Sequence, residues 1–122
     1  MIKVKHFLQA VENDDGQRLW VEPFGLTKDL REWCKVEHVL PHLGPPKALR
    51  DWFEEHPDGY DYFRARYHGT LANSKYKPAL RQLTQAGLRE TFTLLHQSDD
   101  AEHNSATALQ EFLNELEAWI QE

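Results

Sequence analysis

Polar residues suited to ligand binding gather near the C-terminus, between an apolar run at residues 91–96 and an amphipathic segment. The residues concerned are Ser98, Asp99, Asp100, His103 and Asn104. This order is typical of a strand, a polar turn and the first turn of a helix. In α/β proteins such turns lie at the carboxyl ends of strands, where ligands usually bind. The sequence therefore predicts a polar crevice at this turn, although no motif specifies a reaction.

Two interpretations of these residues remain open. Backbone N–H groups at the start of a helix bind anions, so the turn is suited to a small anionic metabolite. The adjacent carboxylates of Asp99 and Asp100 would repel an anion, however. In the alternative interpretation one aspartate ends the strand turn, and Asn104 or Ser105 caps the helix without any ligand.

Metal binding and nucleophilic catalysis have weak support. Asp99, Asp100 and His103 lie within five positions but lack a recognised ligand spacing, and Pro41 disturbs the helix that would align His38 with His42. We therefore expect no metal.

The chain also lacks the signatures of a nucleophile or a phosphate loop. Ser98 has no glycine-flanked elbow, and Cys34 lies beside Trp33 on a predicted apolar stripe, as a buried structural thiol would. None of the six glycines forms a phosphate-binding loop, so we expect no cofactor.

Composition limits the class of protein and its partners. The 122 residues suit one domain, and 14 basic against 20 acidic residues give a formal net charge of -6. A general nucleic-acid binder needs clustered cations, so nucleic acid is an unlikely partner. The single cysteine excludes an intramolecular disulfide, and no apolar stretch reaches the roughly 18 residues of a membrane span. With no signal-peptide pattern at the N-terminus, we expect a cytoplasmic protein without a membrane partner.

The periodicity predicts strands and helices in alternation. Strands are expected from Ile2, at residues 18–22 and at residues 91–96, and helices at residues 26–35, 46–55, 60–71, 78–86 and from residues 103–106 to Ile120. Gly87 is expected to cap the fourth helix in a left-handed conformation. The sequence thus predicts a single α/β domain over residues 1–122, with a mainly parallel sheet covered by helices.

Basic residues concentrate in the middle of this acidic chain: Arg50, Arg64, Arg66, Lys75, Lys77, Arg81 and Arg89. Such a concentration forms either a partner surface or, as we expect, solvated helix faces paired with nearby acids.

Three parts of the chain resemble the YeaO-like branch of the bacterial domain-of-unknown-function family 488. The first is the segment Arg18-Leu19-Trp20-Val21-Glu22. The second is the proline-led Leu49-Arg50 helix, followed by Phe63-Arg64-Ala65-Arg66-Tyr67 and Leu71. The third is Thr93-Leu94-Leu95-His96 with Asn104-Ser105-Ala106. The resemblance implies a compact α/β fold and a cytoplasmic bacterial protein, and it implies no established activity.

The chain departs from the family pattern at several polar positions. Residues 23–28 replace the family's Arg-Leu-Trp-Pro-Arg-Gly segment, Ser105 replaces a histidine, and His96 stands where a tyrosine is usual. Half of the polar groups of a common family ligand site would therefore be missing.

Three functional hypotheses follow. The first is a protein that binds a small anionic metabolite at the strand ends, with Arg18 and the family-like acid Glu22 close to Asp99 and Asn104. The second is a non-catalytic interaction module, or a homodimer, that docks through its acidic C-terminal helix or its basic central face. The third is a degenerate enzyme that keeps the fold without the catalytic groups. Whether the protein is an enzyme stays open.

Overall fold

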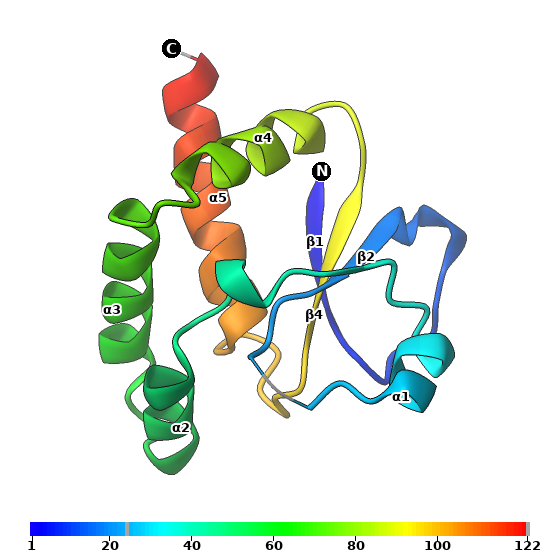
Figure 1. Ribbon diagram of the computed structural model, residues 1–122, viewed down its shortest axis with the longest axis horizontal. Coiled ribbons are helices and arrows are strands. Elements are labelled where there is room, and N and C mark those ends of the chain that lie inside the picture. The colour runs from blue at the N-terminus through cyan, green and yellow to red at the C-terminus, as the bar shows by residue number, and fades with distance from the viewer. Residues whose placement is uncertain (24, 122) are drawn as a thin grey trace.

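A four-stranded parallel sheet forms the centre of the computed structural model, which describes residues 1–23 and 25–121 (Figure 1). In chain order the strands are β1 (Ile2–His6), β2 (Gln17–Trp20), β3 (His38–Val39) and β4 (Phe92–His96). Their spatial order is β1-β4-β2-β3, and every neighbouring pair is parallel. The α/β prediction is therefore confirmed. The sequence did not predict β3 because two residues are too few to show a period.

Five helices cover the sheet: α1 (Lys28–Trp33), α2 (Lys47–Glu55), α3 (Tyr60–Ala72), α4 (Lys77–Gly87) and α5 (Ser105–Gln121). Helix α5 runs between the sheet and α3, whereas α1 lies apart from the other helices (Figure 1). The expected helices are all present. Gly87 does not take the expected left-handed conformation, because it is the last residue of α4, and a Cβ atom there would lie 3.0 Å from Ile2 Cγ1. A close approach of α4 to β1 is thus what favours glycine.

Alternation along the strands divides the apolar residues into two cores. Leu19 and Leu94 face the larger core, which α2 to α5 cover, whereas the neighbouring Trp20 and Leu95 face a smaller core on the α1 side. Cys34 is buried in the smaller core, as expected, and burial raises the pKa of its thiol. Trp33 was expected beside it but is 65% exposed, because α1 ends at that residue and Val36 fills the core instead.

The connection from β1 to β2 must pass β4, which lies between them. It does so without an α-helix, through residues 7–16 and a 3-10 turn at Asn13–Asp15. At its end Gly16 has a φ of 63°, and a Cβ atom there would lie 1.9 Å from the Thr91 carbonyl oxygen. Only glycine fits this turn.

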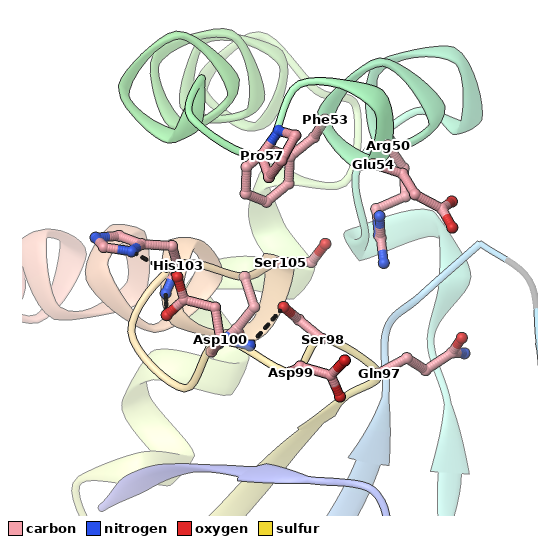
Figure 2. Close-up of a pocket in the computed structure, with 11 residues that line it drawn as sticks. Arg50, Phe53, Glu54, Pro57, Gln97, Ser98, Asp99, Asp100, His103 and Ser105 are labelled. Carbon is pink, nitrogen blue, oxygen red and sulfur yellow. Dashed lines mark hydrogen bonds and ion pairs between the residues drawn. The ribbon is translucent and has the colours of Figure 1, made fainter.

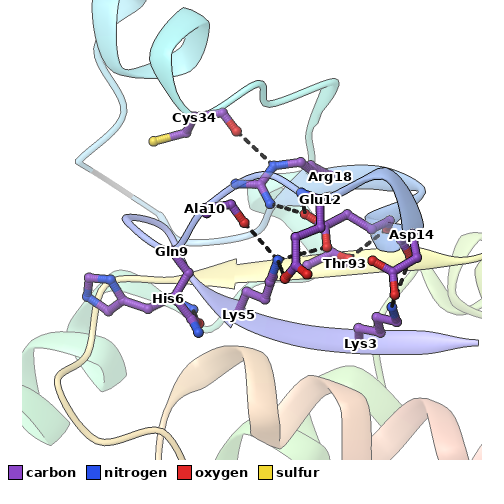
Figure 3. Close-up of polar contacts among 11 residues, drawn as sticks. Lys3, Lys5, His6, Gln9, Ala10, Glu12, Asp14, Arg18, Cys34 and Thr93 are labelled. Carbon is purple, nitrogen blue, oxygen red and sulfur yellow. Dashed lines mark hydrogen bonds and ion pairs between the residues drawn. The ribbon is translucent and has the colours of Figure 1, made fainter.

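A buried carboxylate, Asp15, ties this connection to the sheet (Figure 3). Its Oδ1 accepts a hydrogen bond from Lys5 Nζ of β1 at 2.9 Å, and its Oδ2 accepts one from Arg18 NH1 of β2 at 2.7 Å. The hydroxyl of Thr93 on β4 donates to the Asp15 carbonyl at 2.7 Å. Arg18 Nε also donates to the Cys34 carbonyl at 2.8 Å. One residue therefore contacts all three long strands.

Replacing Asp15 tests this connection. Burial alone would raise the pKa of Asp15, but hydrogen bonds from Lys5, the Glu12 backbone and Arg18 lower it below its usual value. Asp15→Asn removes the charge that these cations face, so we expect the free energy of unfolding at pH 7 to fall by about 3–5 kcal/mol, measured by urea denaturation. The adjacent Asp14→Asn is the matched control, because Asp14 is exposed and pairs with Lys3 at the surface. Equal effects of the two substitutions would contradict the proposed role of Asp15.

Candidate functional site

A cavity of about 340 Å³ lies beyond the carboxyl ends of the central strands (Figure 2). The chain leaves β2 toward α1 on one face of the sheet and leaves β4 toward α5 on the other. Such a divergence between neighbouring parallel strands opens a crevice, which is where ligands bind in open α/β sheets. Helix α2 and its following turn form the opposite wall through Arg50, Phe53, Glu54 and Pro57.

Five of the seven predicted site residues line this cavity: Ser98, Asp99, Asp100, His103 and Asn104. Glu22 lies behind the wall, where its Oε2 accepts a hydrogen bond from Arg50 Nε at 3.1 Å. Arg18 is not among the lining residues, since it lies on the α1 side of the sheet with Asp15. The structure therefore brings Glu22 and the polar turn together around Arg50 and leaves Arg18 elsewhere.

The turn between β4 and α5 is held by its own side chains. Asp100 Oδ1 accepts hydrogen bonds from the backbone N–H groups of Glu102 and His103, and its Oδ2 lies 2.9 Å from His103 Nδ1. Asn104 Oδ1 accepts from the Thr107 N–H at 2.8 Å, which confirms the expected helix cap. Much of the polarity in this turn thus serves the backbone.

His103 is badly placed to act on a ligand. Its hydrogen bond to Asp100 raises the pKa of the imidazole. The ring lies against Tyr60, with 4.8 Å between the ring centroids, and Figure 2 shows it pointing away from Ser98. Ser98 Oγ in turn accepts a hydrogen bond from the Asp100 N–H. These residues do not form a serine nucleophile with a histidine base.

The centre of the site is the buried pair of Glu22 and Arg50, which are 2% and 8% exposed. Burial raises the pKa of Glu22, while the charge and hydrogen bond of Arg50 offset part of this effect. Tyr67 lies close by, donates its hydroxyl to the Leu43 carbonyl at 2.6 Å, and has a pKa raised by burial and by the charge of Glu22. The expectation that Arg50 lies on a solvated face is therefore wrong.

Sequence reasoning missed Arg50 and assigned Ser105 only a capping role. Arg50 precedes the buried Phe53 by three positions, so the two share a helix face. That spacing, together with the family-like Leu49-Arg50 pair, is the signal for an inward arginine. Ser105 is 1% exposed and lines the cavity, and its hydroxyl favours the charged form of Glu22.

Comparison with known proteins identifies the family of the chain. The model of the inactive DUF488-N3 subclade matches residues 1–121. The chain belongs to this subclade. The match confirms the resemblance to family 488. Glu22, Arg50 and Tyr67 lie in the segments that carry this resemblance, whereas Ser105 is one of the departures from the family pattern.

The relatives of this DUF488-N3 protein carry no assigned role. Uncharacterized proteins of Mycobacterium bovis and Mycobacterium tuberculosis are 34% identical to it over 89 residues, which cover 68% of this chain and 70% of each relative. No solved structure matches the chain. Within residues 1–23 and 25–121, no helix has the length and apolar character to cross a membrane.

One group of carboxylates has a spacing suited to a metal ion, but it lies away from the cavity. Glu12, Asp14 and Asp15 each offer an oxygen within 4.8 Å of the others. Lys5 Nζ lies 2.7 Å from Glu12 and 2.9 Å from Asp15, and Lys3 Nζ lies 3.0 Å from Asp14. Because ammonium groups already neutralise these carboxylates, the group is explained as part of the connection between β1 and β2.

The end of β4 makes the stability of the DUF488-N3 protein depend on pH. Burial, followed by the charge of neighbouring His6, lowers the pKa of His96 to about 4. The unfolded chain binds the proton near pH 6.5, so stability is complete above that pH and falls as the pH drops toward 4. We expect this residue alone to remove about 3 kcal/mol between pH 7 and pH 4, measured by urea denaturation.

His96→Asn keeps a side-chain acceptor for the Ser98 N–H and removes the titrating group. The exposed His38 supplies the control His38→Asn. We expect the loss of stability on acidification to shrink in His96→Asn and to stay unchanged in His38→Asn. An unchanged loss in both variants would refute the buried, neutral state of His96.

The cap of α5 gives a separate test of the turn. Asn104→Ala removes the bond to the Thr107 N–H and the bond from Nδ2 to the Asp100 carbonyl. We expect about 1 kcal/mol less stability in thermal unfolding, the usual cost of a lost cap. Asn114→Ala, at an exposed position of the same helix, controls for the change of residue type. A loss no larger than that of the control would show that the cap does not stabilise α5.

Proposed function

We propose that this DUF488-N3 protein binds a small polar ligand in the cavity beyond β2 and β4, without catalysing a reaction on it. The observation that carries this proposal is a pair of buried polar atoms next to the cavity. Within the described residues, neither Ser105 Oγ nor Glu22 Oε1 makes a hydrogen bond of good geometry, although the Ser105 hydroxyl and the Gln97 backbone lie close enough to Glu22 to lower its pKa. A buried polar atom without a partner costs about 1–3 kcal/mol, so a ligand that satisfies Ser105 Oγ, which lines the cavity, would gain binding energy.

Two observations support binding without catalysis. The matched subclade is described as inactive. The histidine of the turn and the buried carboxylate are also engaged within the protein, because His103 contacts Asp100 and Glu22 contacts Arg50, while the carboxylates of Asp99 and Glu54 lie exposed at the mouth. A general acid or base needs a free position within reach of the ligand, which these pairs do not offer.

The charges around the site argue against the anionic ligand that the sequence predicted. An anion was expected because the first turn of α5 faces the crevice. The Glu22 carboxylate already lies beside the Arg50 guanidinium and the Ser105 hydroxyl, where an anionic group of a ligand would bind. An anionic metabolite would have to displace this carboxylate, so a neutral or cationic ligand is favoured.

A thermal-shift screen tests the binding proposal. The panel contains amino acids, amines, sugars, nucleotides, phosphorylated metabolites and divalent metals, because any ligand selective for the folded state raises the unfolding temperature. We expect a stabilising compound whose effect is reduced in Asp99→Asn, which changes the cavity wall. Glu102→Gln is the matched control, since Glu102 belongs to the same turn but does not line the cavity.

A panel without any stabilising compound would contradict the proposal. That result would favour the alternative function, in which the protein docks another protein or a second copy of itself. Trp33, exposed on α1, would be the first residue to replace in that case.

A further inference from the structure

The walls of the cavity carry more negative than positive charge. Glu54, Asp99 and Asp100 contribute carboxylates, and Arg50 contributes a guanidinium that Glu22 already contacts. His103 Nδ1 lies 2.9 Å from Asp100 Oδ2, so the carboxylate of Asp100 is already paired. Glu54 and Asp99 are exposed at the mouth, so a ligand meets negative charge as it enters.

The deepest polar groups at the cavity are hydrogen-bond acceptors, so they suit a ligand that donates. Figure 2 shows the Ser105 hydroxyl directed into the space between Arg50 and Ser98. A carboxylate oxygen such as Glu22 Oε1 can only accept, and a hydroxyl that donates to Glu22 keeps its lone pairs for a second donor. Ser105 Oγ, in the cavity wall, therefore suits an N–H group of a ligand, whereas a ligand group that can only accept would leave it unsatisfied.

The remaining wall is apolar and the cavity is small. Phe53 and Pro57 line the side opposite the polar turn, and the volume is about 340 Å³. A short hydrocarbon chain can pack there while its polar end reaches the deep groups. Aromatic faces such as that of Phe53 also attract cations.

We propose that the ligand is a small primary amine, bound through its ammonium group; this inference rests on the proposed binding function. The ammonium donates to Ser105 Oγ, Asp99 and Glu54 attract its charge, and its alkyl part packs on Phe53. Glu22 lies behind this wall and remains in contact with Arg50 through Oε2. A primary ammonium has three N–H donors, so it can donate to Ser105 Oγ and still reach acceptors of the polar turn.

The charge of the ligand is tested with three probes of similar size: propylamine, propanol and propionate. At neutral pH they carry a positive charge, no charge and a negative charge. Ligand-observed NMR titration of the full chain measures each dissociation constant, and fragments of this size bind on the order of millimolar. We expect the propylammonium ion to bind roughly tenfold or more tightly than the other two, because it alone forms charge-assisted hydrogen bonds.

Substitutions then locate the binding. Ser105→Ala and Asp99→Asn should each weaken propylammonium binding by roughly fivefold or more and leave the weak signal of propanol unchanged. The controls are Ser74→Ala and Glu102→Gln, which change a serine and an acidic residue outside the cavity. Glu22→Gln leaves Arg50 without its counter-charge and can unfold the protein, so the inference does not depend on it.

The outcomes separate this inference from the binding proposal. Tighter binding of propionate or propanol, reduced by Ser105→Ala, would overturn the amine assignment while supporting a ligand site in the cavity. Propylammonium binding that is equal in all variants would overturn the assignment as well, since it would place the ion elsewhere. Failure of propylammonium to bind overturns the amine assignment, and the wider thermal-shift panel then decides separately whether the cavity binds anything.

Discussion

The fold depends on one buried carboxylate. Asp15 accepts hydrogen bonds from Lys5 and Arg18 on two strands that do not touch each other, and its carbonyl receives the Thr93 hydroxyl from the strand between them. A crossover in a parallel sheet is usually covered by a helix, whose apolar face supplies the stabilising contacts. Here the crossover is short, and charge-assisted hydrogen bonds take the place of that face. The cost of burying Asp15 is offset because both carboxylate oxygens have partners.

This crossover also creates the candidate site. Because the chain passes β4 before forming β2, the final strand of the fold enters the middle of the sheet. The segments that follow β2 and β4 then leave toward opposite faces, and the cavity lies between the turn after β4 and helix α2. A second buried ion pair, Glu22 with Arg50, lies at that end. Each pair includes one buried atom without a hydrogen bond of good geometry within the described residues: Arg18 NH2 in the first and Glu22 Oε1 in the second. The second pair differs in its position, because Arg50 lines the cavity whereas Arg18 lies on the other side of the sheet with Asp15.

Local patterns predicted the elements, and tertiary contacts decided the site. The alternation in β1 and β4, the Asn104 cap and the polar turn all depend on neighbouring residues, so the sequence revealed them. The two arginines show the limit. Arg18 was expected in the crevice and Arg50 on the surface, but the structure places Arg50 at the cavity and buries Arg18 beside Asp15 on the other side of the sheet. Residue 18 faces the same side of the sheet as Trp20, whereas Glu22 lies beyond the end of β2 and no longer follows that alternation. The position of Arg50 depends on how α2 packs, which no local pattern encodes.

Ser105 shows what one departure from the family pattern changes at the cavity. The family pattern has a histidine at this position, and an imidazole beside Glu22 could exchange a proton near neutral pH. A serine hydroxyl does not titrate in that range, so it can share hydrogen bonds with the carboxylate but cannot serve as its proton-transfer partner. The side chain is also smaller than an imidazole, which leaves space between Arg50 and Ser98. The same substitution that removes a proton carrier therefore leaves a buried hydroxyl with unused hydrogen-bonding capacity, and that capacity is what a bound ligand would use.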